Sequence, residues 1–221
     1  MKQKTIFITA LILLAALFAG GVQLYRSQQA QDAAATSAKN KEALIRFHSP
    51  SLGRADAPVH IVEFFDPACG TCAAFYPLVK QMLAANREDI RLTVRYAPFH
   101  QGSDEVVKVL EASRKQGRYW QAVEALLASQ SAWVQQHQAQ ADLIWPYLAK
   151  AGLDTEQLKS DMQSPDIARA IAQDVTDAKA LNVTKTPEFF VNGRPLPSFG
   201  FEQLRDLVDE ELAASRNGKA G

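Results

Sequence analysis

The sequence predicts an α/β fold in which a long helical block interrupts a small β-sheet. Three observations support this prediction. An apolar run at residues 60–65, a helical stretch at 73–85 and an alternating run at 91–96 succeed one another as strand, helix and strand. Helical spacing of apolar residues then continues over residues 103–181. A hairpin and a final helix follow over 188–212, so the two halves share one sheet only if the helical block is an excursion from it.

The N-terminal region has the features of an export signal. Lys2 and Lys4 precede an uncharged apolar stretch, residues 5–22, and a helix needs ~20 such residues to cross a bilayer. Because only a poor cleavage site follows this stretch, we expect an uncleaved signal-anchor over residues 1–25, with a cleaved signal peptide as the alternative. The lysines would keep the N-terminus in the cytoplasm. Either fate delivers the rest of the chain to an oxidising compartment.

The remaining residues divide into a tether and one folded domain. Gln, Ala and Ser are frequent early in residues 26–54, as in a tether that leads to a domain. We expect residues 55–102 and 182–216 to form the α/β part of the domain and residues 103–181 to form the helical insertion. The chain has 24 basic and 24 acidic residues without a basic stripe, which argues against nucleic acid as a partner.

Local signals mark the boundaries of several elements. Pro77 lies inside the first predicted helix and should kink it. Asp154 and Ser164 are typical residues at helix starts. Asn192 and Gly193 form a two-residue turn that is typical of a β-hairpin. The final helix should bury one apolar face, made of Phe201, Leu204, Leu207, Val208 and Leu212.

The two cysteines of the chain, Cys69 and Cys72, lie where the first strand meets the first helix. The positive end of a helix favours thiolate over thiol, so we expect Cys69 to be acidic and nucleophilic and Cys72 to close a four-residue disulfide ring. A purely structural disulfide gains little from so short a loop. A structural zinc site needs about four ligands, and no metal site is expected because the histidines are scattered. They are His48, His60, His100 and His137.

Three motifs occur in a characteristic order along the chain. Residues 63–72 read Glu-Phe-Phe-Asp-Pro-Ala-Cys-Gly-Thr-Cys, Pro77 follows five residues later, and Thr186-Pro187 precedes the hairpin. Together they resemble the active-site strand, the kinked helix and the cis-proline loop of the DsbA-like thiol-disulfide oxidoreductases of the thioredoxin superfamily. The resemblance covers roughly residues 55–215 and implies a thioredoxin fold with an inserted all-helical domain.

The resemblance implies catalytic roles for Cys69, Cys72, Glu63 and Pro187. Cys69 would be the exposed nucleophile that forms mixed disulfides, and Cys72 would be the more buried resolving thiol. Glu63 would lie beneath the disulfide and move protons to and from the buried thiol. That role suits a carboxylate whose pKa is raised by burial. The alternative is a Glu63 that is exposed at the edge of the sheet.

The resemblance also implies a substrate-binding loop. Pro187 would be cis and would leave the backbone of Thr186 free to pair with a substrate strand, and Gly70 and Thr71 would contact the substrate as well. DsbA carries Pro-His between its cysteines, whereas Thr71 donates only a neutral hydrogen bond to the thiolate. We therefore expect the pKa of Cys69 to lie below ~8.5 but above the ~3.5 of DsbA. The reduction potential should lie between about −120 and about −270 mV.

These observations predict an enzyme, a thiol:disulfide oxidoreductase. The leading hypothesis is a periplasmic dithiol oxidase, anchored in the bacterial inner membrane, that donates the Cys69–Cys72 disulfide to exported proteins. A DsbB-like membrane protein would re-oxidise it, and no cofactor besides the redox-active disulfide is expected. A disulfide reductase or isomerase using the same cysteines is the first alternative. A Cu(I)-handling thiol protein is the second, because soft thiolates favour Cu(I).

Overall fold

The computed structural model describes residues 13–25, 27–28, 31, 35, 40 and 43–218 of the chain. The chain forms two compact units, residues 1–39 and residues 40–221. In the first unit, residues 13–25 are helical. The rest of the predicted anchor, residues 1–12, and most of the predicted tether up to residue 42 lie outside the described residues. Of the helices that are described, none is both long and apolar enough to span a bilayer.

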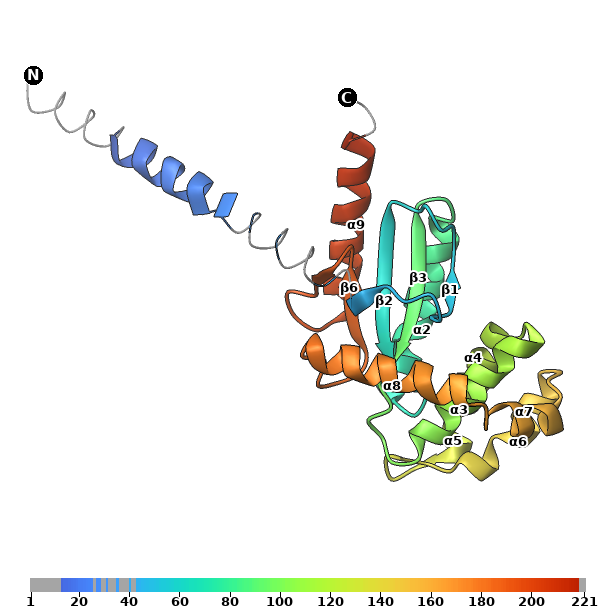
Figure 1. Cartoon of the computed structure of the whole chain (residues 1–221). Helices are drawn as coiled ribbons and strands as arrows, with labels where there is room; N and C mark the ends of the chain where they lie inside the picture. The colour runs from blue at the N-terminus through green and yellow to red at the C-terminus, as the bar shows by residue number, and fades with distance from the viewer. Residues whose placement is uncertain are drawn as a thin grey trace, which may run out of the picture. The chain divides into compact units, whose positions relative to one another are not determined.

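Five strands in the described part of the second unit form one mixed sheet, ordered β1-β3-β2-β6-β7 (Figure 1). They are β1 (Ser51–Leu52), β2 (Val59–Phe65), β3 (Ile90–Tyr96), β6 (Glu188–Val191) and β7 (Arg194–Pro195). β2 and β3 run parallel, as the β-α-β order predicts, and the other neighbouring strands are antiparallel. Because β6 pairs directly with β2, both halves of the chain share this sheet and the helical block is an excursion from it.

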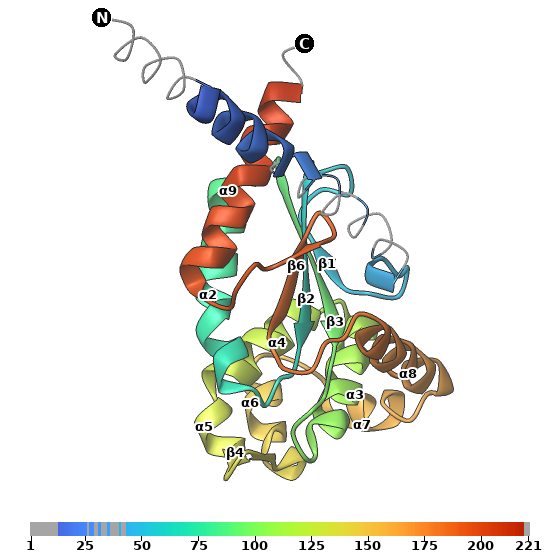
Figure 2. The same cartoon turned by 90° about the vertical axis from the view of Figure 1, so that its left-hand side faces the viewer.

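Side chains alternate along β2 between two apolar layers. Ile61 and Phe65 belong to the larger core cluster, together with residues of α2 (Gly70–Ala85) and α9 (Phe201–Gly218). Val62 and Phe64 belong to a smaller cluster that includes residues of α8 (Pro165–Ala180). Figure 2 shows α2 and α9 on one face of the sheet and α8 on the other. The reactive cysteines and Glu63 lie on the α2 face.

The residues predicted to lie inside the first helix, at helix starts and in the hairpin turn occupy those positions in the structure. Pro77 is inside α2, which continues to Ala85. Asp154 caps α7 (Thr155–Asp161), and its side chain accepts hydrogen bonds from two backbone N–H groups. Ser164 occupies the N-cap of α8. Asn192 and Gly193 have φ angles of 50° and 85°, which is the left-handed geometry of a primed hairpin turn.

One residue of the final helix departs from the predicted apolar face. Leu204, Leu207, Val208 and Leu212 are buried, but Phe201 is 48% exposed. Phe201 is the first residue of α9, beyond the part of the helix that faces the sheet. Its ring instead stacks on Phe75 of α2, with centroids 4.1 Å apart. The prediction of a buried Phe201 was therefore wrong.

The helical block contains short helices and one small hairpin. In chain order the helical elements before α7 are α3 (Ser103–Ser113), η1 (Arg114–Gln116), α4 (Tyr119–Ala128), α5 (Gln130–Trp133), η2 (Ala141–Leu143) and α6 (Trp145–Lys150). β4 (Val134–Gln135) and β5 (Gln138–Ala139) form an antiparallel pair between α5 and η2. The predicted all-helical insertion thus contains a hairpin. Its turn, Gln136-His137, lacks the usual asparagine-glycine signal although both residues have positive φ angles.

The segment before residue 55 is part of the folded unit rather than a tether. β1 pairs with β3 at Ser51 and Leu52, and Leu44 is buried in the smaller core cluster. A strand of two residues is too short to give a sequence signal. The tether predicted over residues 26–54 therefore extends too far towards the domain.

A buried charged cluster holds this N-terminal segment against β3 and α8. Arg95 is fully buried, and its guanidinium donates to Asp174 Oδ1 at 2.8 Å and to Asp177 Oδ2 at 2.5 Å. Arg46 forms a bidentate ion pair with Asp177, from Nε to Oδ2 at 2.8 Å and from Nη2 to Oδ1 at 2.7 Å. His48 Nε2 lies 2.7 Å from Asp174 Oδ1. Charges from three separate segments of the chain are thus neutralised together on the α8 face.

Candidate active site

Cys69 lies where the sequence predicts, at the N-terminus of α2. β2 ends at Phe65, and the following turn is closed by a hydrogen bond from Cys69 N to Asp66 O at 3.0 Å. Cys69 is the N-cap of α2, and its carbonyl oxygen accepts from Ala73 N at 3.2 Å. Cys72 lies within the first turn of the helix. Both cysteines are free thiols in this structure.

The two thiols have opposite acidities. Hydrogen bonds lower the pKa of Cys69 to about 5, the largest from the Cys72 side chain and further ones from Thr186 and the backbone N–H groups of Thr71 and Cys72, against an opposing effect of burial. Burial raises the pKa of Cys72 well above its ordinary value, and the proximity of Cys69 and Glu63 adds to this effect. The value for Cys69 lies inside the predicted window. At neutral pH Cys69 is the thiolate and Cys72 keeps its proton.

Cys69 is less accessible than predicted. It is only 5% exposed, whereas Cys72 is fully buried. In the thiol form Cys69 Sγ donates to the carbonyl oxygen of Thr186 at 3.2 Å. Gln130 Nε2, from the helical block, donates to the carbonyl oxygen of Cys69 at 3.1 Å. These neighbours cover most of the residue, and its sulfur is reached from the cavity that Cys69, Thr186 and Gln130 line.

Glu63 is buried on β2, on the same face of the sheet as α2. It is 2% exposed, between Val94 of β3 and Phe189 of β6 in the strand pairing. Burial raises the pKa of Glu63 to about 8, and the negative charge of Cys69 adds to the shift. This placement excludes the alternative of an edge-exposed carboxylate. At neutral pH the side chain holds a proton, and it is close enough to Cys72 to affect the acidity of that thiol.

The loop before β6 borders the reactive thiol. The Thr186-Pro187 peptide bond is cis, which confirms the prediction. The Thr186 carbonyl oxygen is the group that accepts from Cys69. Gly70 and Thr71, the other predicted substrate contacts, are exposed and line the same cavity as Cys69 and Thr186. The structure therefore brings together all of the predicted site residues.

Asp66 is a buried residue beside the site that the sequence analysis did not single out. It is fully buried, and its Oδ1 accepts from Ala68 N at 2.9 Å and from the hydroxyl of Ser103. Its Oδ2 accepts from Phe99 N at 2.7 Å and His100 N at 2.9 Å, and His100 Nδ1 lies 2.8 Å away. One carboxylate thus joins the turn before Cys69 to the loop after β3 and to the start of α3. An aspartate after a strand usually indicates only a turn, so no local signal identified it.

The cavity beside Cys69 has a volume of about 840 Å³ and is bounded by four parts of the chain. The α2 side contributes residues 68–71, the loop after β3 contributes residues 99–100, the Thr186 loop contributes residues 184–186, and the helical block contributes Gln130, His137 and their neighbours. The block is attached here by a hydrogen bond from Ala139 N to Gln101 O at 2.8 Å. A side chain at Gly102 would bring its Cβ to 2.5 Å from Ala139 O, so this close approach requires glycine.

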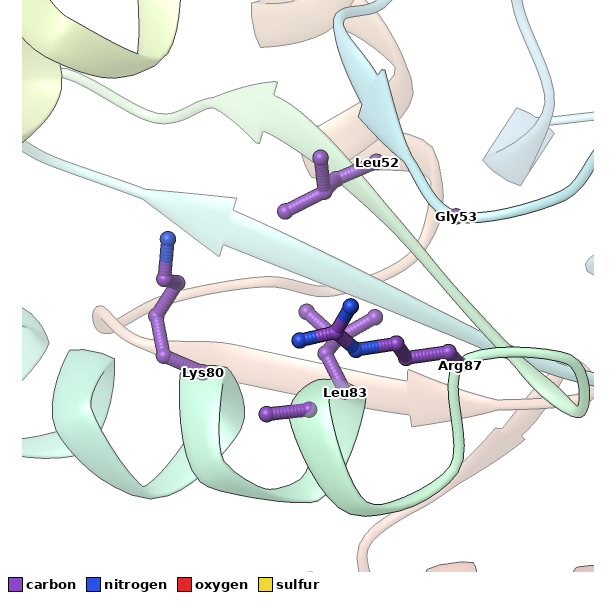
Figure 3. Close-up of a pocket in the computed structure, with 6 residues that line it drawn as sticks. Leu52, Gly53, Lys80, Leu83 and Arg87 are labelled. Atoms are coloured by element: carbon purple, nitrogen blue, oxygen red, sulfur yellow. The ribbon is translucent and has the colours of Figure 1, made fainter.

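A second, smaller cavity of about 290 Å³ lies near the C-terminal end of α2 (Figure 3). Leu52 and Leu83 line its apolar part, and Lys80 of α2 and Arg87, which follows the end of α2, line it as well (Figure 3). None of the predicted site residues borders it. Within the described part of the chain, no group of three or more metal-ligating side chains is arranged to hold an ion.

Comparison with known families and structures agrees with this geometry. The family model described as thioredoxin matches residues 47–210. A thioredoxin-like oxidoreductase from Silicibacter pomeroyi has a similar structure, with 31% identity and a TM-score of 0.67 over 76% of this chain and 95% of that one. The thiol-disulfide exchange protein α-DsbA2 from Wolbachia pipientis shares the fold at 19% identity, with a TM-score of 0.69 over 83% of this chain and 97% of that one.

The chain is also similar to part of a much longer protein. It is 31% identical over 166 residues to the Na⁺/H⁺ antiporter NhaA of Herminiimonas arsenicoxydans. The match covers 75% of this chain and 25% of the antiporter. The chain therefore spans about a quarter of the length of that relative.

Proposed function

The chain belongs to the thioredoxin family, and from that premise we propose that it is a thiol-disulfide oxidoreductase that acts as a dithiol oxidase on exported proteins. The observation that carries the proposal is the opposite acidity of the two thiols, with the pKa of Cys69 lowered to about 5 and that of Cys72 raised. A thiolate that is stable at neutral pH is a good leaving group. It therefore favours the reduced enzyme and transfer of the disulfide to the client.

The reaction proceeds by two exchanges that balance in electrons and protons. A client thiolate attacks the Cys69 sulfur, the Cys69–Cys72 bond breaks, and Cys72 leaves and takes a proton from Glu63. The second client thiol releases its proton to solvent and attacks the client sulfur of the mixed disulfide, which frees Cys69 as thiolate, and Glu63 regains a proton from solvent. The client loses two electrons and the enzyme gains them. A protonated Glu63 beneath Cys72 suits the first step, because a buried leaving thiolate is costly without a proton donor.

The same cysteines support a reductase or isomerase, and the direction depends on the reduction potential. Stabilisation of the Cys69 thiolate lowers the free energy of the reduced form and makes the enzyme more oxidising. Thr71 contributes only a backbone N–H to that stabilisation, where DsbA has a histidine side chain. We therefore place the enzyme among oxidases weaker than DsbA.

Several features of the working enzyme are part of this proposal. The redox-active disulfide is the only cofactor that the reaction needs. A DsbB-like, quinone-linked membrane protein accepts the two electrons from the reduced enzyme. The catalytic domain works in the periplasm, and residues 1–25 anchor it in the inner membrane. The uncharged stretch at residues 5–22, preceded by two lysines, supports this location.

Two measurements test the function. Equilibration with glutathione buffers should give a potential between about −120 and about −270 mV, and the full chain should accelerate oxidation of a reduced client protein. Alkylation of the reduced chain, with each site read by mass spectrometry, should show Cys69 reacting with a midpoint near pH 5 and Cys72 remaining protected. A potential below this window, with rescue of scrambled client by the dithiol form, would instead identify a reductase or isomerase. A Cys69 alkylation midpoint near the ordinary value of ~8.5 would refute the proposed acidity of this thiol, and with it both the oxidase and the reductase or isomerase hypotheses.

A further inference from the structure

The cavity beside Cys69 carries a one-sided distribution of charge. Among its described lining residues Lys185 is the one cation, His100 and His137 add imidazole rings that can donate hydrogen bonds, and no lining residue is acidic. The polar remainder consists of threonine, serine and glutamine side chains that donate hydrogen bonds. Such a lining suits a ligand with a carboxylate.

The nearest acidic groups do not cancel this charge at the cavity surface. Asp66 lies beneath His100, but it is fully buried and its two oxygens already accept from four protein donors besides His100 Nδ1. Glu63 is buried below the thiols, on the α2 face of the sheet. Glu188 interacts electrostatically with Lys185, but it is half-buried on β6 outside the cavity wall, and burial raises the pKa of Glu188, which favours its neutral form. A client in the cavity therefore meets the basic side chains and not these carboxylates.

Lys185 has a defined place relative to an incoming client. It precedes Thr186, whose carbonyl oxygen lies 3.2 Å from the Cys69 sulfur. Its ammonium group lies 5.0 Å from the centre of the Phe199 ring, beside the cavity. A client strand that pairs with the backbone of Thr186 would place the neighbours of its reactive cysteine within side-chain reach of Lys185, since paired strands bring side chains to within about 5 Å.

His137 forms the opposite wall. It lies in the turn of the β4–β5 hairpin with a φ angle of 63°, a conformation that is costly for residues other than glycine. This turn places its ring 6.5 Å, centre to centre, from that of His100. The hairpin is held against the loop before α3 by the hydrogen bond from Ala139 N to Gln101 O. The block thus adds a donor surface to the active site that the sheet and α2 do not supply.

We propose that this cavity selects clients in which the reactive cysteine is flanked by acidic residues. Lys185 and the facing pair of His100 and His137 bind those acidic side chains. The inference rests on the proposed function and adds a substrate class to it. Attraction between the cavity and an acidic flank raises the rate of encounter and of mixed-disulfide formation. We expect an advantage of about tenfold over a basic flank at low ionic strength.

The test uses three blocked peptides with one cysteine, flanked on both sides by Asp, Asn or Lys. The rate of attack on the oxidised full chain is measured by stopped flow at low salt and divided by the rate of attack on hydroxyethyl disulfide. This neutral reference corrects for the effect of the flanks on the reactivity of the peptide thiol itself. The corrected rates should fall in the order Asp, Asn, Lys. In about 1 M salt, where the screening length is only about 3 Å, they should converge.

Reversing the charge of Lys185 tests whether the preference for the Asp peptide arises at the cavity. Lys185→Glu should reduce or invert the preference for the Asp peptide. Lys150→Glu, an equal charge change at the exposed end of α6, should leave the preference unchanged. Equal corrected rates for the three peptides, or a preference that Lys185→Glu does not alter, would overturn the inference while leaving the enzyme an oxidoreductase. If no peptide attacks faster than it attacks hydroxyethyl disulfide, the proposed function fails as well.

Discussion

Buried carboxyl groups lie on both faces of the sheet, but their pKa values shift in opposite directions: that of Glu63 is raised and that of Asp177 is lowered. On the α2 face, no cation of the described chain pairs with Glu63, and burial raises its pKa to about 8. On the α8 face, burial alone would raise the pKa of Asp177 too, but hydrogen bonds from Arg46 and Arg95 outweigh it and the pKa is lowered. The neighbours therefore decide whether a buried carboxylate is a proton donor or a structural anion.

The largest expected effect comes from removing the buried cation of the α8 face. Arg95→Met leaves Asp174 and Asp177 buried without their shared partner, which should lower the free energy of unfolding by roughly 3–5 kcal/mol. Urea denaturation at pH 7 measures it. Arg91→Met is the matched control, because Arg91 lies on the same strand and face but is only half-buried and makes no ion pair among the described residues. Equal losses in the two variants would contradict a special role for the Arg95 cluster. The reduction potential should not change in either variant.

Glu63→Gln should have the opposite effect on stability. In the folded protein Glu63 keeps its proton up to about pH 8, whereas the unfolded chain releases it near pH 4.5. The free energy of unfolding of the wild type therefore falls as pH rises between these values. We expect the variant to be more stable by roughly 1–3 kcal/mol at pH 7 to 8, with no gain near pH 4.5. Denaturation of the reduced proteins across this range measures the difference.

The same variant tests the role of Glu63 in exchange. Its rate of attack by a client thiol should be lower than that of the wild type at neutral pH, because Cys72 loses its proton donor. If the rates match at every pH, Glu63 has no catalytic role, whatever its effect on stability. A stability gain that does not vary with pH would show that Glu63 is not a buried, protonated acid.

Asp177→Asn tests the carboxylate of the α8 face. It should change the free energy of unfolding by a smaller amount than Glu63→Gln, and in the opposite direction. The folded-state pKa of Asp177 is lowered, so its charge stabilises the fold above pH 3.8, and this contribution is lost as pH falls through the folded-state value. The variant should be less stable by roughly 1–2 kcal/mol at pH 7. The deficit should shrink below about pH 4, as the wild type takes up its proton. A deficit that persists unchanged at acid pH would point to packing rather than charge.

The catalytic part of the site was predictable because its signals are local. The cysteine pair lies between a predicted strand and helix, and the resemblance carried by three short motifs implies the cis bond and the place of Glu63. Cys69 and Cys72 at the start of α2, the buried Glu63 and the cis bond before Pro187 all lie where the sequence analysis placed them.

The missed parts depend on contacts between distant segments. Asp66 is important because Phe99, His100 and Ser103, more than thirty residues later, direct their donors at it. The β4–β5 hairpin turns at Gln136 and His137, which adopt positive φ angles although neither is the asparagine or glycine that usually occupies such a turn. Arg46 and β1 are held by partners on β3 and α8, so nothing in their own segment distinguishes them from a tether.

The helical block is connected to the sheet at two junctions, residues 97–102 and 181–187, and both run past the reactive sulfur. A change in either junction therefore alters the surroundings of Cys69 directly, whereas α8 contacts the sheet separately, through Asp174 and Asp177 on Arg95. Chimeras that exchange only residues 119–150 between relatives would alter the block side of the cavity while keeping Asp174 and Asp177 against Arg95.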